Sequence, residues 1–392
     1  MDPAVVAAWI AAGVSGLTLI GTLTAQYLGH RATNKQLERT FAEQHTRTLN
    51  ERFATAAEQL GSDKPAVRLA GVHAMAALAD DWEENRQVCV DVLCAYLRLP
   101  DEPDSSRDAL EPQGQAFQAN REVRHTVIRV IAARLRKDAA TSWQGLDLDF
   151  TGVVFDGGDF SSVQFSSGTV SFREARFSGG TVSFREARFS GGTVDFTRAR
   201  FSGGMISFHH ARFTGGTVNF TGADFSDGTV EFTEATFSVS TIHFVRARFS
   251  GGTVNFTGAD FSGGTVSFGA AQFSGGTVSF REARFSGSRV YFSGARFSGG
   301  TIWFTGAHFS RSEVNFSAYF SGGELSFTDA RFSGGNASFG KAQFTGATVD
   351  FTGAQFSGGW VDFRYADDWS FPPIFSWTGT PPPVVHLPSG VA

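Results

Sequence analysis

The residues that could support chemistry are few, and they do not form a catalytic pattern. His209 and His210 are the one adjacent histidine pair in the sequence. Neighbouring residues on a strand point to opposite faces, so we do not expect this pair to bind a metal. Cys89 and Cys94 are the two cysteines, and a spacing of five without a second pair is not a zinc motif. We interpret them as buried thiols in a reducing compartment.

The remaining polar residues recur in blocks. Arg-Glu-Ala-Arg occurs at 173–176, 185–188 and 281–284. On stacked layers, such blocks would place charges outward, where they can pair between layers. No phosphate-binding loop, paired metal ligands or Ser/His/Asp arrangement is present. We therefore predict no enzymatic activity, no cofactor and no metal site.

A phenylalanine ladder must position these blocks. Of the 42 Phe, 37 lie between Phe150 and Phe363. The first gaps are five residues, and the later ones alternate between seven and five, apart from a gap of four between Phe316 and Phe320. A fixed period over this length indicates a repeat architecture.

The repeat unit has twelve residues, Val-x-Phe-x-x-Ala-x-Phe-x-Gly-Gly-Thr. Residues two apart on a strand share a face, so the aliphatic residue and the following Phe point the same way. We predict an interior built from these positions. Its representatives are Phe172, Phe177, Val182, Phe184, Ala187, Phe189, Phe196 and Phe201.

A helix cannot accommodate this pattern, because Gly-Gly every twelve residues would break it. Short strands that turn at each pentad can. The chain would then coil, and successive coils would stack as parallel strands about 4.8 Å apart. Both 20 and 24 residues per coil are open; we favour 24, with the Gly-Gly pairs at opposite corners and about nine turns.

The sequence at 256–263, Phe-Thr-Gly-Ala-Asp-Phe-Ser-Gly, and the five-residue spacing at 148–165 resemble pentapeptide-repeat proteins. The resemblance covers residues 145–366 and implies a right-handed quadrilateral β-helix. The chain departs from the family pattern by using Phe almost to the exclusion of Leu and by its two-residue insertion in every second pentad. The expected fold class is α+β multidomain, with a helical N-terminal part before this solenoid.

The N-terminus has the composition of a membrane anchor. No charged residue occurs from Pro3 to Gly29, and about 20 apolar residues suffice to span a bilayer as a helix. We predict a transmembrane anchor at 1–30 with Val5, Trp9, Ile10, Val14, Leu17, Ile20, Leu23 and Leu28 in the membrane. Arg31, Lys35 and Arg39 follow it, which places the C-terminal bulk in the cytoplasm. Ala8, Ala12 and Gly16 would allow two copies to pair as a homo-oligomer.

Three further segments are predicted around the solenoid. An extended juxtamembrane helix covers 31–60, and an α-helical module at 61–140 has helices from Pro65, near 84–98 and at about 119–138. This module resembles the one that precedes the repeats in membrane-anchored bacterial pentapeptide proteins, and we expect its last helix to cover the first coil. Residues 367–392 form a C-terminal cap and Pro-rich tail. Trp369, Phe371–Phe375 and Trp377 are predicted to leave the register as a lid, and the tail from Pro381 to be disordered.

The coil is close to neutral, with 17 Lys/Arg and 18 Asp/Glu from Asp147 to Arg364. The resemblance suggests one alternative function, mimicry of DNA to inhibit an enzyme such as DNA gyrase, but this requires an acidic surface. A threonine row (Thr169, Thr181, Thr193 and onward) should split onto two sides of the coil. We therefore predict a membrane-tethered, non-enzymatic scaffold that binds an unknown protein partner and contacts lipid through one helix. No nucleic-acid partner is expected.

Overall fold

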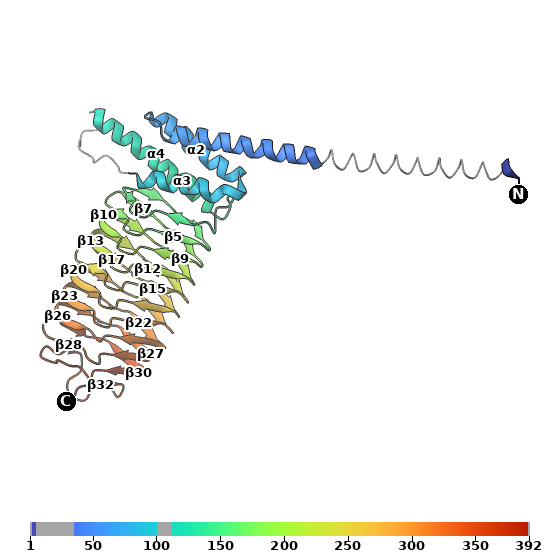
Figure 1. The fold of residues 1–392 in the computed structure, drawn as a ribbon. Coiled ribbons are helices and arrows are strands. Elements are labelled where there is room, and N and C mark those ends of the chain that lie inside the picture. Colours follow the sequence, from blue (N-terminus) through green and yellow to red (C-terminus); the bar gives the residue numbers. More distant parts are fainter. Residues whose placement is uncertain (1, 5–34, 100–111, 391–392) are drawn as a thin grey trace.

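A computed structural model describes residues 2–4, 35–99 and 112–390 of the chain, and Figure 1 shows a helical module at one end of a long stack of strands. Residues 35–60 form one helix. The other helices are α2 (Pro65–Asp81), the short 3-10 helix η1 (Glu83–Asn85), α3 (Arg86–Arg98) and α4 (Pro112–Leu135). The predicted membrane-spanning residues 5–29 lie outside the described residues. In the part that is described, no helix has the length and apolarity needed to cross a membrane.

The helix at 35–60 is only partly packed against the module. Leu49 and Leu60 are buried, whereas Leu37 and Phe41 are more than half exposed. Helices α2, α3 and α4 pack their apolar faces together, with Val72, Leu93 and Val127 inaccessible to solvent. Helix α4 begins at Pro112, earlier than the expected start near 119, because proline suits the first turn of a helix, where its missing N–H costs no hydrogen bond.

The solenoid is made of two parallel sheets joined by turns. The 14-stranded sheet contains β2 (Val154–Phe155), β3 (Gly158–Asp159), β6 (Arg176–Phe177), β7 (Thr181–Ser183), β10 (Arg200–Ser207), β13 (Asp224–Glu231), β16 (Arg248–Phe249), β17 (Thr253–Asn255), β20 (Gln272–Ser279), β23 (Arg296–Trp303), β26 (Tyr319–Ser326), β28 (Gln343–Phe344), β29 (Thr348–Phe351) and β31 (Ile374–Phe375).

The 18-stranded sheet contains β1 (Leu148–Asp149), β4 (Gln164–Phe165), β5 (Thr169–Ser171), β8 (Arg188–Phe189), β9 (Thr193–Asp195), β11 (Arg212–Thr214), β12 (Thr217–Asn219), β14 (Thr236–Ser238), β15 (Thr241–His243), β18 (Asp260–Ser262), β19 (Thr265–Ser267), β21 (Arg284–Ser286), β22 (Arg289–Tyr291), β24 (His308–Ser310), β25 (Ser312–Asn315), β27 (Arg331–Ser338), β30 (Gln355–Asp362) and β32 (Val385–His386).

The strand register shows that one coil holds 24 residues. Phe201 lies beside Phe225, and Val170 beside Val194. The first coil is shorter, since Leu148 pairs with Val170, and the gap of four before Phe320 removes one residue from a later coil. The stack has about ten turns, close to the nine predicted. Its handedness and a four-sided cross-section stay predictions.

Phenylalanine fills the interior as four columns of stacked rings. One column runs Phe150, Phe172, Phe196, Phe220, Phe244, Phe268, Phe292, Phe316, Phe339, Phe363; a second runs Phe155, Phe177, Phe201, Phe225, Phe249, Phe273, Phe297, Phe320, Phe344; a third runs Phe160, Phe184, Phe208, Phe232, Phe256, Phe280, Phe304, Phe327, Phe351, Phe375; and a fourth runs Phe165, Phe189, Phe213, Phe237, Phe261, Phe285, Phe309, Phe332, Phe356. Phe196 and Phe220 are typical, with ring centroids 4.8 Å apart and planes 5° from parallel.

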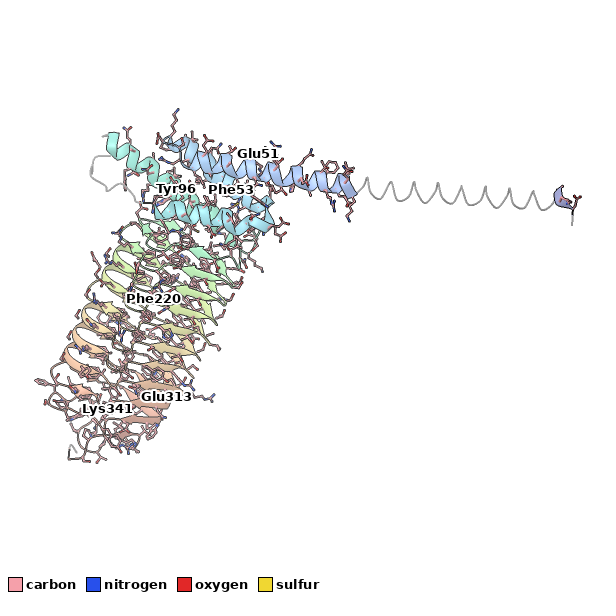
Figure 2. The ribbon with its side chains drawn as sticks, in the orientation of Figure 1. Glu51, Phe53, Tyr96, Phe220, Glu313 and Lys341 are labelled. Carbon is pink, nitrogen blue, oxygen red and sulfur yellow. The ribbon has the colours of Figure 1, made fainter. Side chains whose placement is uncertain are left out.

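The first and third columns meet edge to face, whereas neighbouring rings of the first and second columns are tilted, as for Phe196 and Phe201 at 43°. The rings of Phe196 and Phe208 are 6.0 Å apart and cross at 86°. Aromatic pairs favour both this arrangement and offset stacking over a face-to-face sandwich. In Figure 2, Phe220 lies inside the stack, while Glu313 and Lys341 are on its surface. The aromatic part of the interior is therefore continuous along the stack, and buried Val, Ile and Ala residues lie beside it.

Two kinds of backbone turn make the coil possible. Phe-x-x-Ala segments close with a hydrogen bond from the alanine N–H to the phenylalanine carbonyl, as from Ala199 to Phe196 at 3.0 Å. The third residue has a positive φ in these turns up to Gly353, but not at Tyr365. At the second glycine of several Gly-Gly pairs, the coils approach too closely for a side chain. A Cβ on Gly204 would lie 2.3 Å from the carbonyl oxygen of Gly180, so only glycine fits there.

Two helices, not only the last one, cover the first coil. From α3, Gln87 and Arg98 donate hydrogen bonds to the carbonyl oxygens of Asp147 and Asp149 at 2.8 and 2.9 Å. From α4, Arg124 donates to the carbonyl oxygen of Val154 at 2.9 Å. These side chains occupy the positions that strand N–H groups of a preceding coil would take. They therefore cover a strand edge that could otherwise pair with another strand.

The C-terminal residues follow the coil further than predicted. Phe375 does not leave the register, since it stacks on Phe351 at 5.4 Å. Trp369 and Trp377 cover the ends of other columns, at 5.2 Å from Phe344 and 5.6 Å from Phe356. The predicted disorder from Pro381 is wrong for β32, in which Val385 pairs with Val361 and is buried. Val385 therefore continues the stack at the 24-residue spacing.

Candidate interaction surface

A typical coil contains two Phe-x-x-Ala turns, and the equivalent turns of successive coils line up as two edges that run along the stack. Both edges use the same backbone and the same repeat positions, but their side chains differ. The first edge lies at the turns that begin at Phe172, Phe196, Phe220 and their equivalents. The second edge lies at the turns that begin at Phe184, Phe208, Phe232 and their equivalents. This alternation follows from two twelve-residue units in each 24-residue coil.

The first edge carries what we name the arginine row. It consists of Arg176, Arg200, Arg248 and Arg296, with Asp224 and Gln272 at the same repeat position on the coils between them. All four arginines are exposed. Among the described residues, none of the four takes part in an ion pair, and Arg296 instead lies 5.8 Å from the ring of Tyr319. The row therefore presents four exposed guanidinium groups without ion-pair partners in the described part of the chain, with Asp224 as its one carboxylate.

Other basic residues lie beside the row. Arg246 and Lys341 occupy turns on the same edge and are exposed. Arg198, on a third turn, forms an ion pair of 3.6 Å with Glu174 on the preceding coil. A groove of about 510 Å³ adjoins the C-terminal half of the row and is lined by Gln272, Ser274, Arg296, Ser298, Tyr319, Ser321, Gln343 and Thr345.

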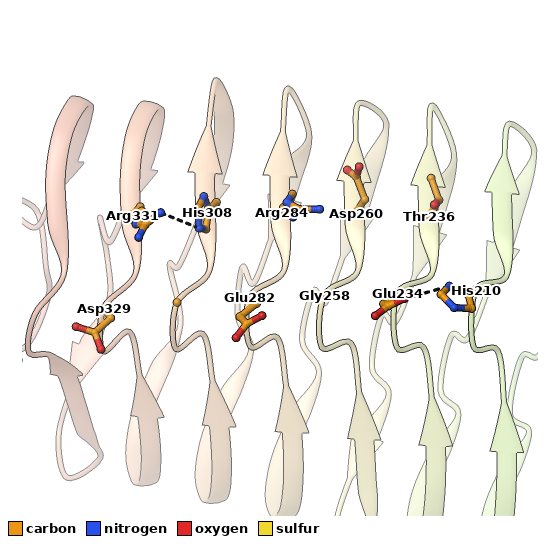
Figure 3. A pocket seen from close by; sticks show the side chains of 11 residues that line it. His210, Glu234, Thr236, Gly258, Asp260, Glu282, Arg284, His308, Asp329 and Arg331 are labelled. Atoms are coloured by element: carbon orange, nitrogen blue, oxygen red, sulfur yellow. Dashed lines mark hydrogen bonds and ion pairs between the residues drawn. The ribbon is translucent and has the colours of Figure 1, made fainter.

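The second edge contains a longer hollow, which we name the histidine–carboxylate groove (Figure 3). Its volume is about 620 Å³, and it is lined by His210, Glu234, Thr236, Gly258, Asp260, Glu282, Arg284, Gly306, His308, Asp329 and Arg331. The hollow exists because Gly258 and Gly306 interrupt the series of turn side chains. Figure 3 shows the remaining side chains in two rows on successive coils.

The groove holds four carboxylates, Glu234, Asp260, Glu282 and Asp329, and two guanidinium groups, Arg284 and Arg331. His210 lies 3.3 Å from Glu234, and Arg331 lies 3.5 Å from His308. Burial, with the positive charges of Arg331 and Arg284, lowers the pKa of His308, which keeps its imidazole neutral at pH 7. The groove can form hydrogen bonds with a polar partner, and its carboxylates outnumber its guanidinium groups.

Chemistry in the described part of the chain is limited. No group of three or more His, Cys, Asp and Glu there could hold a metal ion. His209 and His210 have rings 4.0 Å apart. Cys89 and Cys94 are buried free thiols, and burial raises their pKa values to about 11 and about 12, so both are protonated at neutral pH.

The structure places the sequence-predicted residues as follows. Phe172, Phe177, Val182, Phe184, Ala187, Phe189, Phe196 and Phe201 all lie in the interior with at most 2% of their surface exposed. Val5, Trp9, Ile10, Val14, Leu17, Ile20, Leu23 and Leu28 lie outside the described residues. The threonine row does divide between the two sheets, with Thr217 beside Thr193 and Thr253 beside Thr229.

The Arg-Glu-Ala-Arg blocks behave only partly as expected. Pairing between coils occurs from Arg173 to Asp195 at 2.9 Å. Arg185 instead pairs with the adjacent Glu186, and Arg281 lies over the ring of Trp303 at 3.8 Å. The total charge of the coil hides the difference between its edges. Reading each repeat position at a period of 24 instead of twelve would have separated the arginine row from the opposite edge.

These observations define a β-solenoid with a filled aromatic interior and two chemically different edges. Residues 167–217 match the family model for pentapeptide repeats (9 copies). The parallel strand pairing continues on both sides of the matched segment, from β1 to β32. No curated protein and no solved structure matches the chain.

Proposed function

We propose that this chain is a non-enzymatic scaffold that is tethered to the membrane by its N-terminal segment and presents the solenoid to a protein partner in the cytoplasm. The observation that carries the proposal is the set of four continuous phenylalanine columns. They make the solenoid solid and stiff, so that its edges hold side chains at fixed spacings. Solenoid proteins commonly use such extended surfaces for binding.

The filled interior supports a binding role over a catalytic one. Small-molecule enzymes usually enclose their substrates in a concave pocket with a few convergent polar groups. Here the inward positions are taken by Phe, Val and Ala, of which Phe220, Val218 and Ala223 are each at most 2% exposed. The grooves on the two edges are open and polar, which suits contact with another macromolecule.

DNA mimicry is less well supported than a scaffold role. A DNA-like surface would need acidic groups along the whole rod. The arginine row places exposed, unneutralised cations on one edge instead. An enzyme that binds DNA through a basic channel would be repelled by Arg176, Arg200 and Arg248.

The tether rests on the uncharged segment from Pro3 to Gly29 and on the basic residues that follow it. Membrane fractionation of the full chain tests it. We expect the protein in the membrane fraction after carbonate washing, and we expect Leu17→Arg with Ile20→Arg to move it to the soluble fraction. A wild-type chain that is washed off the membrane would contradict the tether.

The scaffold role is tested by cross-linking in cells that produce the full chain, followed by purification and identification of attached proteins. We expect a specific protein to be retained by the wild type and lost when residues 145–366 are deleted. Retention of the same proteins by the deleted form would show that the solenoid is not the binding element.

A further inference from the structure

We propose that the arginine row binds an acidic polypeptide segment whose charge pattern complements the row. This inference rests on the proposed scaffold function and specifies the chemistry of its partner. The row has an order of charges that is set by the sequence: positive at Arg176 and Arg200, negative at Asp224, positive at Arg248, neutral at Gln272 and positive at Arg296.

The spacing along the row is fixed by the interior. Phe177, Phe201 and Phe225 directly follow Arg176, Arg200 and Asp224 in their strands, and their rings stack at 4.9 and 4.7 Å. The arginine Cα atoms of neighbouring coils are therefore held about one strand spacing apart. The backbone of the row is already ordered before a partner binds, which reduces the entropic cost of association.

A mixed pattern favours a polypeptide over a uniformly charged polymer. A nucleic-acid backbone or an anionic lipid surface would place negative charge against Asp224, whereas a polypeptide can place a lysine there. Single-stranded nucleic acids also use exposed aromatic side chains for stacking. The one aromatic residue in this row, Tyr319, has Arg296 near its ring.

The groove beside the row gives the partner a place to lie. Its volume of about 510 Å³ lies between the row and the serines that follow the interior Phe residues, Ser274, Ser298 and Ser321. The serine hydroxyls of 298 and 321 lie 3.5 and 3.3 Å from carbonyl oxygens of the preceding coil, to which they donate. A main chain in this groove would have Arg296, flanked by Gln272 and Tyr319, on one side and hydroxyl oxygens on the other.

The opposite edge supplies a matched control. Arg188, Arg212 and Arg284 occupy the same repeat position in the second unit of their coils and are also exposed. Among the described residues they form no ion pair either, but the turns beside them carry Glu186, Glu234, Glu282 and Asp329. The described turns beside the arginine row instead carry Arg198, Arg246 and Lys341, with Glu174 as the one carboxylate. Changing three arginines on either edge alters total charge equally but removes the row in one case only.

The first test measures binding of a fluorescein-labelled acidic peptide of about twenty residues to the full chain in neutral detergent, by anisotropy. We expect Arg200→Glu, Arg248→Glu and Arg296→Glu together to weaken binding at least tenfold, and Arg188→Glu, Arg212→Glu and Arg284→Glu to change it less than about twofold. Equal losses on the two edges would overturn the proposal. Circular dichroism shows whether both variants fold, and wild-type binding that does not weaken as salt is raised overturns it without any variant.

The second test exchanges charges across the interface. Two peptides are compared, identical except for a lysine or a glutamate between their acidic halves. The wild type should prefer the lysine peptide, and Asp224→Arg should prefer the glutamate peptide. The absence of this reversal, or tighter binding of labelled oligothymidine or phosphatidylserine vesicles than of either peptide, would overturn the proposal. A partner that is cross-linked through the solenoid in cells but is indifferent to the arginine row would leave the scaffold function standing without this interface.

Discussion

The interior of the solenoid and its outer edges are built from the same repeat but follow different rules. Inside, each position repeats almost without change, because a ring such as Phe220 must stack on Phe196 below and Phe244 above. Outside, one repeat position holds Arg200, Asp224 and Arg248 on successive coils. Packing fixes the interior, whereas the edges are free to differ from coil to coil. Binding specificity in this molecule therefore has to be sought where the repeat is least regular.

The largest effect is expected from breaking a column in the interior. Phe220→Ala removes a ring with stacked neighbours at 4.8 Å on both sides and an edge-to-face neighbour, Phe232, at 6.0 Å. Loss of a buried phenylalanine costs about 3–5 kcal/mol of unfolding free energy. Urea denaturation followed by far-UV circular dichroism measures the loss. Thr221→Ala, at the following turn position, is the control and should cost under about 0.5 kcal/mol. A loss below about 1 kcal/mol for Phe220→Ala would mean that the columns do not carry the stability.

The two glycines of one Gly-Gly pair differ in whether close packing between coils leaves room for a side chain. At Gly180, φ is +62°, and an added Cβ would lie 2.1 Å from the carbonyl oxygen of Asp156. At Gly179, no atom lies within 4 Å of an added Cβ. We expect Gly180→Ala to cost about 2–3 kcal/mol and Gly179→Ala to be neutral or slightly stabilising. Thermal denaturation of the two single variants gives the comparison, and similar melting temperatures would contradict it.

The junction between the helical module and the first coil contains a partly buried carboxylate, that of Asp156. The Asp156 carboxylate is bonded by Arg121 Nε and by His125 Nε2, the latter at 2.9 Å. Burial alone would raise its pKa, but the hydrogen bonds from His125 and Arg121 outweigh burial and hold the pKa below the ordinary value. This carboxylate therefore contributes stability above about pH 4, the unfolded value, and the contribution is lost as pH falls through the folded pKa.

Asp156→Asn should remove that pH dependence and cost about 1–3 kcal/mol at pH 7, because Arg121 and His125 lose an ionised partner. The measurement is the free energy of unfolding of both forms from pH 7 to pH 3. The two curves should converge as the pH falls. Asp159→Asn is a suitable control, since its ion pair with Arg136 is longer, at 3.4 Å. A constant difference at all pH values would exclude the carboxylate as its cause.

The sequence predicts the interior far better than the edges, and the reason is physical. The alternating gaps between Phe172, Phe177 and Phe184 indicate strands, turns and a coil of 24 residues, because few arrangements can bury such a series. The edges have no comparable constraint. That Arg176 and Arg200 form one row, while Arg188 and Arg212 form another on the opposite side, becomes visible only when the coil length is fixed.

The contacts between the helices and the first coil could not be predicted from the sequence either. Nothing in the spacing of Gln87, Arg98 or Arg124 shows that they donate to carbonyls of the first coil, because these contacts depend on how two helices sit across it. At the other end, Phe375 and Val385 hold the 24-residue spacing from Phe351 and Val361. The prolines that flank Phe375 and Val385 favour loops, so the sequence did not predict that the stack continues there.

The smallest effect is expected at an exposed turn, and it should have the opposite sign. Ala270 is exposed at the third residue of its turn, with φ of +54°, a conformation that is unfavourable for residues other than glycine. Ala270→Gly relieves this strain but gives the unfolded chain more freedom, so we expect a net stabilisation of about 0.5 kcal/mol. The next residue, Ala271, is buried in the interior. Ala271→Gly should be destabilising, by about 1 kcal/mol, since it removes a buried methyl group and adds unfolded-state freedom. If the two changes in unfolding free energy have opposite signs, interior packing constrains Ala271 but not its neighbour Ala270. If they have the same sign, the two residues are under the same constraint.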